Sequence, residues 1–362
     1  NSVAGDKSKM NSYELGASFS LDYPRLLLPW MKNKSNRFLF PSHTSFKLYV
    51  DQLNRARFFK MLSFGGTVSY DFQPSRTWKH TVTPFRLAFN TLQHTTSEFD
   101  SIINVNKSLA LSLGNQFIPA MSYTFTYDNA PLKKRHNLWW ETSFTSAGNV
   151  TSLVYAAFGK GMKEKGKELL GSPFAQFLKM TSEIRCLFKV GEKQHIATRL
   201  MGGVLYAYAN QTVAPYSEQF YIGGANSIRA FTVRSIGPGT FHPNADNRYG
   251  YIDETGDVKL EANIEYRFPI LGDLYGATFL DAGNVWLMKK DEARPGGELT
   301  MRNFAKSVAL GTGVGLRYDL TFLVIRLDLG IALHAPYDTG KSGYYNIPVS
   351  YTHLTLPTKL EV

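Results

Sequence analysis

One arginine and two carboxylates stand out among the residues that could do chemistry. Arg229 lies in the glycine-rich segment GGANSIRAF, Glu265 lies in NIEYRFP, and Asp281 lies in YGATFLDAGNVW. The planar guanidinium of arginine fits a carboxylate in two parallel charge-assisted hydrogen bonds, which lysine cannot form. The segment has no lysine-serine or lysine-threonine pair that would make it a phosphate-binding loop. These residues therefore indicate an ion pair that fastens a loop.

The arginine belongs to a longer motif in residues 209–256, the longest interruption between predicted strands. Its glycines let the backbone turn tightly, and a proline stiffens the return. The motif residues are Gly223, Gly224, Ile228, Arg229, Ala230, Phe231, Gly237, Pro238 and Gly239. We expect Arg229 to bind Glu265, Asp281 or both. Alternatively, Arg229 lies on a solvated loop tip, and the carboxylates pair with Arg267, Arg317 or Arg326.

Other reactive residues do not form a recognisable site. Cys186 is the single cysteine, which excludes an internal disulfide and a cysteine-based zinc site. No nucleophile motif accompanies the histidines, and isolated ones such as His195 and His334 more often line a wall or a turn. The sequence predicts no catalytic residue, no metal site and no cofactor. A barrel enzyme such as a lipase or protease is the alternative that hydrolysis assays would test.

Short segments with a two-residue period must position these side chains. In YELGASFSLDY, which runs from Tyr13 to Tyr23, apolar side chains share one face and polar or small residues share the other. The pattern recurs in LSFGGTVSYDF, LKMTSEIRCLFKV and LVIRLDLGIAL. It predicts about twelve strands. They lie near 13–23, 43–54, 61–73, 80–91, 116–127, 137–146, 176–190, 195–208, 257–268, 274–286, 305–318 and 322–334.

Composition and loop lengths favour a membrane barrel over a soluble sandwich. Aromatic residues make up 14% and charged residues 19% of the 362 residues. No apolar run approaches the ~18 residues of a membrane-spanning helix. Short turns alternate with the long connections 92–115, 147–175, 209–256 and 287–304. The polar faces are rich in Gly, Ser and Thr, as in a wet lumen, while the apolar faces suit lipid. The sequence thus predicts an all-β protein, a transmembrane antiparallel β-barrel.

Charge and aromatic residues are consistent with a membrane location. The formal net charge is +11, with basic residues scattered along strands and turns. Attraction to anionic lipid or lipopolysaccharide explains this charge better than nucleic acid does. We expect several aromatic residues to form belts at the membrane interfaces. They are Trp139, Trp140, Tyr206, Tyr208 and Trp286.

Three segments in order carry a resemblance to a known family. FYIGGANSIRAFTVRSIGPGTF, LEANIEYRFPILG and GATFLDAGNVW resemble the barrel of the BamA/TamA outer-membrane assembly superfamily, also called the bacterial surface antigen domain. The resemblance covers residues 13–336. It implies that the loop 209–256 enters the lumen and that Arg229 meets Glu265 and Asp281. The common motif has glycine after the arginine, whereas this chain has Ala230, where a left-handed backbone would be unfavourable.

The resemblance also implies a domain organisation. The segment NSYELGASFSLDYPRLLLPW is more similar to the TamA-like branch than to the central BamA. Family barrels have sixteen strands preceded by periplasmic POTRA domains, so about twelve strands would make residues 1–348 a partial barrel. POTRA domains would then be absent from this chain. The ending VSYTHLTLPTKLEV, residues 349–362, is interpreted as a non-native tail.

The function implied by the resemblance is protein assembly, insertion or translocation in the bacterial outer membrane. Such a factor acts without nucleotide, through a barrel that opens sideways, and it is not an enzyme. Its expected partners are unfolded outer-membrane protein clients, membrane lipid and lipopolysaccharide, and periplasmic or inner-membrane assembly subunits reached through POTRA domains. The alternatives are a passive outer-membrane pore and a two-partner secretion translocator.

Overall fold

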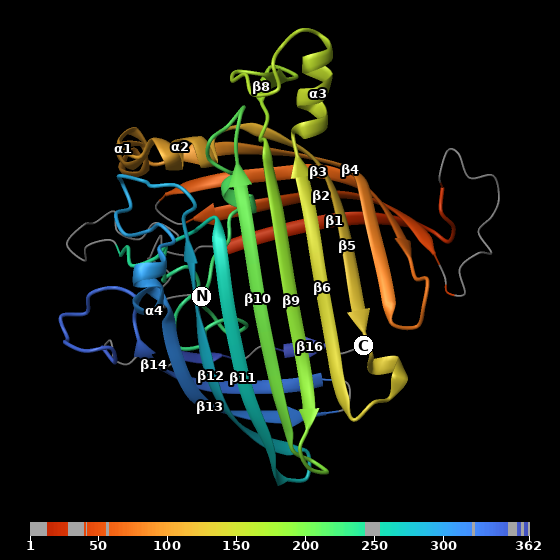
Figure 1. Cartoon of the computed structure of the whole chain (residues 1–362), viewed down its shortest axis with the longest axis vertical. Coiled ribbons are helices and arrows are strands. Elements are labelled where there is room, and N and C mark those ends of the chain that lie inside the picture. Colours follow the sequence, from red (N-terminus) through yellow and green to blue (C-terminus); the bar gives the residue numbers. More distant parts are fainter. Residues whose placement is uncertain are drawn as a thin grey trace. The chain divides into compact units, whose positions relative to one another are not determined.

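The protein is mainly antiparallel β-structure. The computed structural model describes residues 13–27, 40, 42–55, 58–242, 254–320, 323–346, 353–355 and 358–360. Twelve long strands in this part of the chain correspond to those predicted from the alternation, and their hydrogen-bonded order follows the chain (Figure 1). They are β1 (Tyr13–Tyr23), β2 (His43–Arg55), β3 (Phe59–Phe72), β4 (Trp78–Thr95), β5 (Gln116–Asp128), β6 (His136–Ala147), β9 (Phe177–Lys189), β10 (His195–Ala207), β11 (Val258–Leu271), β12 (Leu274–Trp286), β13 (Ala309–Asp319) and β14 (Leu323–His334).

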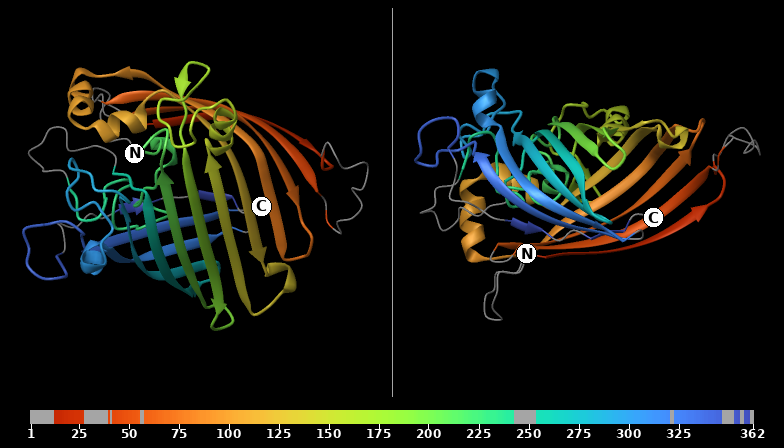
Figure 2. Two further views of the ribbon diagram at one scale, coloured as in Figure 1. Left: turned by 45° about the horizontal axis from the view of Figure 1, so that its top comes forward. Right: turned by 90° about the horizontal axis from the view of Figure 1, so that it is seen from below.

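The chain divides into two compact units, and the first contains the meander β1 to β4. This unit comprises Asn1–Thr126, Thr142–Met180 and Leu205–Glu218. Its four strands pair antiparallel with their neighbours in the chain and lie side by side in both views of Figure 2. Apolar side chains such as Leu48 and Phe85 are exposed on them, at 65% and 54%. An outward apolar row is expected where a strand faces lipid.

Two helices occupy the connection 92–115, which the sequence predicted only as a long loop. They are α1 (Ser97–Val105) and α2 (Lys107–Leu113), and Thr96 and Asn106 cap their N-termini with side-chain oxygens. Apolar residues of both helices pack on strands β2 and β3. The buried cluster comprises Leu53, Phe59, Met61, Phe99, Leu113 and Tyr216. The helices therefore close one end of this meander with a small hydrophobic core.

The connection 147–175 also contains regular structure. Helix α3 (Asn149–Ala157) begins two residues after β6 ends. The two-stranded hairpin of β7 (Glu168–Leu169) and β8 (Ser172–Pro173) follows it. Both elements belong to the first unit.

The second unit contains the meander β10 to β14. It comprises Tyr127–Glu141, Thr181–Val204 and Gln219–Val362, and its consecutive strands pair antiparallel. The turn η4 (Met301–Asn303) and the short helix α4 (Phe304–Ser307) lie between β12 and β13, and the turn η2 (Ala130–Leu132) of the same unit lies between β5 and β6. Because α4 takes up residues 304–307, β13 begins at Ala309 and not near 305 as predicted.

Burial in the second unit is opposite to that of a water-soluble sheet. Ile264 and Val314 are exposed, at 51% and 54%, whereas Glu265 and Asp281 are buried. Alternate residues on a strand point to opposite faces, so the strands turn apolar side chains outward and charged ones inward. Charged residues are almost never fully buried unless they are paired, so these carboxylates require partners.

The expectation that Trp286 contributes to an interface belt is wrong. Its side chain is 1% exposed, and its indole nitrogen donates a 2.9 Å hydrogen bond to Ser307 Oγ. The ring stacks on Phe304, with 5.5 Å between ring centroids. Helix α4 therefore covers the tryptophan at the end of β12. A two-residue pattern along a strand carries no information about such a covering helix.

Residues near the C-terminus continue the pairing of β14. Within the predicted tail 349–362, the short strands β15 (His353–Thr355) and β16 (Thr358–Leu360) both pair antiparallel with β14, and the other tail residues lie outside the described ones. Among the described residues, no helix is both long enough and apolar enough to cross a membrane.

Candidate functional site

The glycine-rich segment folds into a compact turn that presents Arg229. Gly223 and Gly224 adopt φ values of 97° and 94°, which favour glycine. A methyl group on Gly223 would lie 2.1 Å from the carbonyl oxygen of Thr232, so side chains are excluded there. The amide of Gly224 donates to the carbonyl of Phe231 at 2.8 Å. The segment therefore closes on itself around the arginine, and Ile228 is fully buried within it.

Arg229 binds both predicted carboxylates. Its Nε and Nη2 donate to the two oxygens of Asp281, at 2.9 Å each, and its backbone amide donates to Asp281 Oδ2 at 3.1 Å. Its Nη1 donates to Glu265 Oε2. The guanidinium carbon also lies 3.5 Å from the ring centroid of Phe279, which adds a cation–π contact. With 5% of its side chain exposed, this arginine is not on a solvated tip.

Two of the arginines considered as alternative partners of the carboxylates also bind Glu265. Glu265 accepts hydrogen bonds from Arg267 Nε at 2.7 Å and from Arg317 Nη2 at 2.9 Å. The two arrangements considered from the sequence are therefore not exclusive, because one carboxylate serves three arginines. Strands β11 and β13 supply Glu265 and its further partners, while the loop supplies only Arg229.

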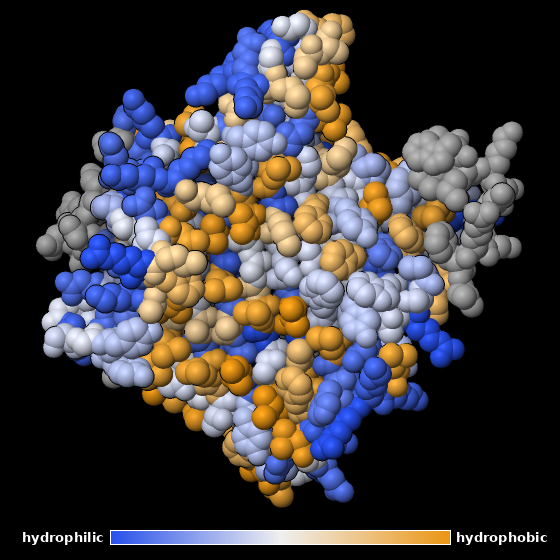
Figure 3. Space-filling view, in the orientation of Figure 1, coloured by the Kyte–Doolittle hydropathy of each residue, from blue (hydrophilic) through white to orange (hydrophobic). Residues whose placement is uncertain are grey.

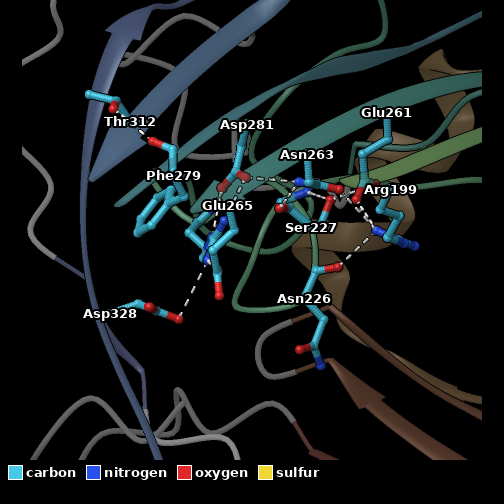
Figure 4. A network of polar contacts seen from close by, with 12 residues as sticks. Arg199, Asn226, Ser227, Glu261, Asn263, Glu265, Phe279, Asp281, Thr312 and Asp328 are labelled. Carbon is cyan, nitrogen blue, oxygen red and sulfur yellow. Dashed lines mark hydrogen bonds and ion pairs between the residues drawn. The ribbon is translucent and has the colours of Figure 1, made fainter. Parts of the chain in front are cut away.

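Asp328 on β14 is a third carboxylate in this network, which the sequence analysis missed. It is 1% exposed and lies 2.6 Å from Arg317 Nη1, 3.3 Å from Arg326 Nη2 and 3.9 Å from Arg229 Nη1. Figure 4 shows Asp328 together with Glu265 and Asp281. The parity of LVIRLDLGIAL places Asp328 on the polar face, and this was the available signal. The resemblance named acids only on the first two strands after the loop.

The network keeps Arg229 charged. Burial disfavours its charge, but the hydrogen bonds that Arg229 donates to Asp281 and the negative charges of Asp281 and Glu265 outweigh burial and raise the pKa of Arg229. A buried arginine with two hydrogen-bonded carboxylates avoids the large penalty of an isolated buried charge. The arrangement can hold a loop.

Ala230 fits without a left-handed backbone. It is not among the described residues with positive φ, and it is fully buried. Two glycines on neighbouring strands make room for it: methyl groups on Gly311 and Gly330 would lie 2.6 Å from its Cβ and 3.0 Å from its Cα. The strain expected for alanine at this position is therefore absent, because the backbone there is not left-handed, and the two glycines leave space for the methyl group.

The second half of the motif is attached to β12. Gly237 has φ of 83°, and the Gly237–Pro238 peptide bond is cis. The amide of Gly239 donates to the carbonyl of Val285 at 2.7 Å, and Asn284 Nδ2 donates to the carbonyl of Gly239 at 2.7 Å. Both ends of the motif thus contact β12, and Phe231 between them is buried.

A polar cluster extends the site along β11. Ser227 Oγ donates to Glu261 Oε2 at 2.8 Å, and Asn263 Nδ2 donates to both the Ser227 carbonyl and Asp281 Oδ1, at 2.9 Å each. Arg199 of β10 also donates to Glu261 (Figure 4). The sequence placed Glu261 and Asn263 on the polar face without assigning them partners. They fix the serine that precedes the buried Ile228 and Arg229.

The loop 209–256 also makes an ion pair within the first unit. There the loop residue is negatively charged, whereas Arg229 is positively charged. Glu218 lies in the turn η3 (Tyr216–Glu218) and is 6% exposed. It accepts hydrogen bonds from Arg86 and from Lys179 Nζ, the latter at 3.0 Å. Asn90 Nδ2 donates to Ser217 Oγ at 2.7 Å. The sequence analysis did not single out Glu218, because no motif surrounds it.

Among the residues that the structure describes, no group of three His, Cys, Asp or Glu side chains is placed to hold a metal ion. Both ring nitrogens of His334 lie within hydrogen-bond distance of backbone carbonyls, including that of Lys306 at 2.9 Å, and the ring stacks on Tyr344. This histidine has a structural position at the end of β14.

Comparison with known proteins gives the family. The chain matches the Omp85 superfamily domain over residues 2–347. It is 30% identical over 167 residues to the Sorting and assembly machinery component 50 homolog A of Xenopus laevis, an alignment that covers 45% of this chain and 34% of the relative. The chain therefore spans about a third of the length of this curated relative.

Solved structures show the same fold at low identity. BamA from Haemophilus ducreyi lacking POTRA domains 1–3 superposes with a TM-score of 0.64 at 13% identity, covering 96% of this chain and 62% of that chain. CdiB from Escherichia coli gives a TM-score of 0.50 at 13% identity, covering 91% and 51%. The predicted resemblance to the BamA/TamA superfamily and the predicted outer-membrane location are confirmed. The chain belongs to the Omp85 superfamily, a family of outer-membrane β-barrel proteins.

Proposed function

We propose that this chain is the barrel of a factor that inserts other proteins into the outer membrane or translocates them across it. Family membership supports this function, as does the relative whose name describes a sorting and assembly machinery. The observation that carries the proposal is the buried Arg229, which joins a loop to strands β11 and β12 through Glu265 and Asp281. A buried, fully paired arginine is suited to holding a scaffold in one conformation.

The loop 209–256 is proposed to lie in the lumen of the barrel. In support, Glu265, Asp281 and Asp328 are buried on strands whose alternate residues, including Ile264 and Val314, are exposed and apolar. If the apolar rows face lipid, the acids and the loop they hold lie on the opposite, interior side. Residues 243–253 of this loop lie outside the described ones.

Assembly is proposed to proceed without nucleotide and through sideways opening of the barrel. A client strand would pair by its backbone with an exposed strand edge, the physics of strand addition in other complexes. Folding of the client in the membrane releases free energy, because every backbone hydrogen bond must be satisfied there. The glycine-rich loop carries no phosphate-binding lysine, so its sequence offers no nucleotide site.

The proposed partners follow from this role. They are unfolded outer-membrane protein clients, the surrounding lipid and lipopolysaccharide, and assembly subunits that bind POTRA domains. The proposal is that of an assembly factor and not of an enzyme, as the family membership supports. Which clients are accepted depends on the complete protein and its subunits.

The experiment is reconstitution of the full-length protein in lipid vesicles without nucleotide. An unfolded outer-membrane client is added, and its folded fraction is measured with time. We expect Arg229→Ala to lower the folding rate while the protein still inserts in the vesicles. The matched control is Arg185→Ala, since Arg185 is 54% exposed and forms a salt bridge with the strand residue Glu183. Equal activity of the Arg229 variant and the control would contradict the proposal.

Conductance distinguishes a passive pore from an assembly factor. A barrel whose lumen holds a fastened loop should carry only small, intermittent current across a planar bilayer. A large steady current from the unaltered protein, with no effect on client folding, would favour the pore instead. A two-partner secretion translocator would be recognised by export of one dedicated substrate and no stimulation of other clients.

A further inference from the structure

Helix α3 exposes an apolar stripe to its surroundings. Val150, Leu153 and Val154 are 51%, 54% and 54% exposed, and Phe158, which follows the helix, is 83% exposed. With the exposed Ala157, their positions follow the i, i+3, i+4, i+7 and i+8 spacing of one helix face. A helix on a water-soluble protein would turn this face toward the core, so its outward direction requires an apolar neighbour.

The opposite face of α3 is polar and fixes the helix to the protein. Ser152 is fully buried, and its Oγ donates to Gln176 Oε1 at 2.9 Å. Asn149 Oδ1 accepts from Tyr208 at 2.6 Å and from Gln176 Nε2 at 3.1 Å. Lys167 Nζ donates to Ser152 Oγ at 3.1 Å. The outward orientation of the apolar stripe is therefore set by a hydrogen-bonded inner face.

Lysines follow the stripe directly. Lys160, Lys163 and Lys165 are exposed, and the ammonium of Lys160 lies 5.5 Å from the ring centroid of Tyr155 on the helix. Met162 between them is 40% exposed. In Figure 3, apolar side chains cover one side of the projecting loop around α3, and hydrophilic side chains cover the other. Apolar and cationic surfaces side by side are typical of helices that bind anionic lipid.

The stripe is also continuous along the chain with lipid-facing strand residues. Helix α3 starts two residues after β6, on which Phe144 is 44% exposed. The strand that follows the connection, β9, exposes Leu178 and Met180 at 50% and 45%. Because the family spans the outer membrane with such strands, a helix next to their ends lies close to the boundary of the bilayer.

We propose that α3 rests on a membrane leaflet, with its apolar stripe among the acyl chains and the three lysines on anionic headgroup phosphates. The favoured occupant is lipid, because the stripe follows a lipid-facing strand and is bordered by positive charge. Each lysine near an anionic surface favours binding by about 1 kcal/mol, or roughly fivefold. Removing all three lysines should therefore reduce the preference for anionic lipid strongly.

The test uses the full-length protein in nanodiscs of phosphatidylcholine alone or mixed with phosphatidylglycerol. A fluorophore is attached to a cysteine at Val154 in a Cys186→Ser background, and the control label replaces Asp100, an exposed residue of α1. Quenching by spin-labelled lipid is compared with quenching by iodide from the water. We expect lipid quenching of the label at position 154, increased by phosphatidylglycerol, and iodide quenching of the label at position 100.

A second variant tests the charge contribution. Combined Lys160→Gln, Lys163→Gln and Lys165→Gln substitutions should abolish the increase with phosphatidylglycerol. Iodide quenching at position 154 in both membranes would overturn the proposal, because the helix would then lie in water. Protection from both quenchers would also overturn it, since a protein partner or a second copy would cover the stripe. Equal lipid quenching in the two membranes would refute the role of the lysines and the proposal as stated.

Discussion

Arg229 engages two carboxylates in different ways, and the difference explains why arginine is needed. Asp281 receives two parallel hydrogen bonds from Nε and Nη2, while Glu265 receives a third from Nη1. A lysine ammonium is a compact charge on a flexible stem and cannot reproduce this planar fork. Substitution by lysine would keep the charge and lose the bidentate geometry.

Two substitutions of Arg229 distinguish the contribution of its charge from that of its bidentate geometry. Arg229→Ala leaves two buried carboxylates without this partner, and removal of one partner of a buried pair typically costs about 3–5 kcal/mol. Because Arg267 and Arg317 still neutralise Glu265, we expect the lower end of this range. Arg229→Lys should lose less. Urea unfolding in lipid vesicles would measure both, and a lysine variant as stable as the unaltered protein would contradict a role for the bidentate contact.

The alternation of polar and apolar residues along the strands identified the acidic partners of Arg229, but it did not identify the full network of ion pairs. Glu265 and Asp281 were identifiable because each lies on a polar face within a family motif. Asp328 has the same parity signal, yet nothing in the sequence states which inward residues of distant strands converge. Convergence depends on register: Arg317 pairs across the sheet with Arg326, and Asp328 is paired with Gly315. Such pairings follow from packing of the whole sheet.

A glycine on β14 tests whether the loop is packed against the wall. A methyl group on Gly330 would lie 2.9 Å from the carbonyl oxygen of Arg229 and 3.0 Å from the Ala230 amide nitrogen. Backbone atoms cannot yield easily, so we expect Gly330→Ala to destabilise the protein by about 1–3 kcal/mol.

The matched control is Gly202→Ala on β10, where the nearest atom would lie 4.0 Å away. Thermal unfolding, followed by the heat-dependent change in electrophoretic mobility, would compare the two variants. A Gly330 variant as stable as the Gly202 variant would show that the loop does not rest on β14.

At the scale of elements, the strands were predictable and the helices in the connections were not. The two-residue period extends over eleven or more residues in most strands, so their positions agree with the structure to within a few residues. Helices α1, α2 and α3 each have nine residues or fewer. Isolated helices this short are marginal in water, because most of their stability comes from packing. The buried contacts of Phe99 and Leu113 supply that packing for α1 and α2.

The ion pairs of the turn η3 lead to a prediction about how firmly the loop 209–256 is held. Glu218→Gln removes the charge that Arg86 and Lys179 both contact, leaving two cations close together. We expect residues 209–218 to loosen and to be cut faster by protease in the full-length protein. Glu192→Gln, at an exposed turn, is the control and should not change cleavage. Unaltered cleavage of the Glu218 variant would mean that contacts other than this ion pair hold η3.

In the whole molecule, the loop 209–256 forms ion pairs in both compact units. The loop contributes a negative residue in the first unit and a positive residue in the second. Glu218 attaches it to Arg86 and Lys179 in the first unit, and Arg229 attaches it to Glu265 and Asp281 in the second. The family and the mainly β fold followed from motifs and alternation in the sequence. The attachment at Glu218 did not, because it depends on packing between residues more than one hundred positions apart.

The most direct test is a double-mutant cycle between Arg229 and Asp281 in the full-length protein. Unfolding free energies are measured for Arg229→Ala, Asp281→Ala and the double variant in the same lipid. Residues in direct contact show coupling energies of about 0.5–3 kcal/mol. For a buried bidentate pair we expect a value in the upper half of that range. Additive effects of the two substitutions, with no coupling, would contradict the claim that this ion pair holds the loop.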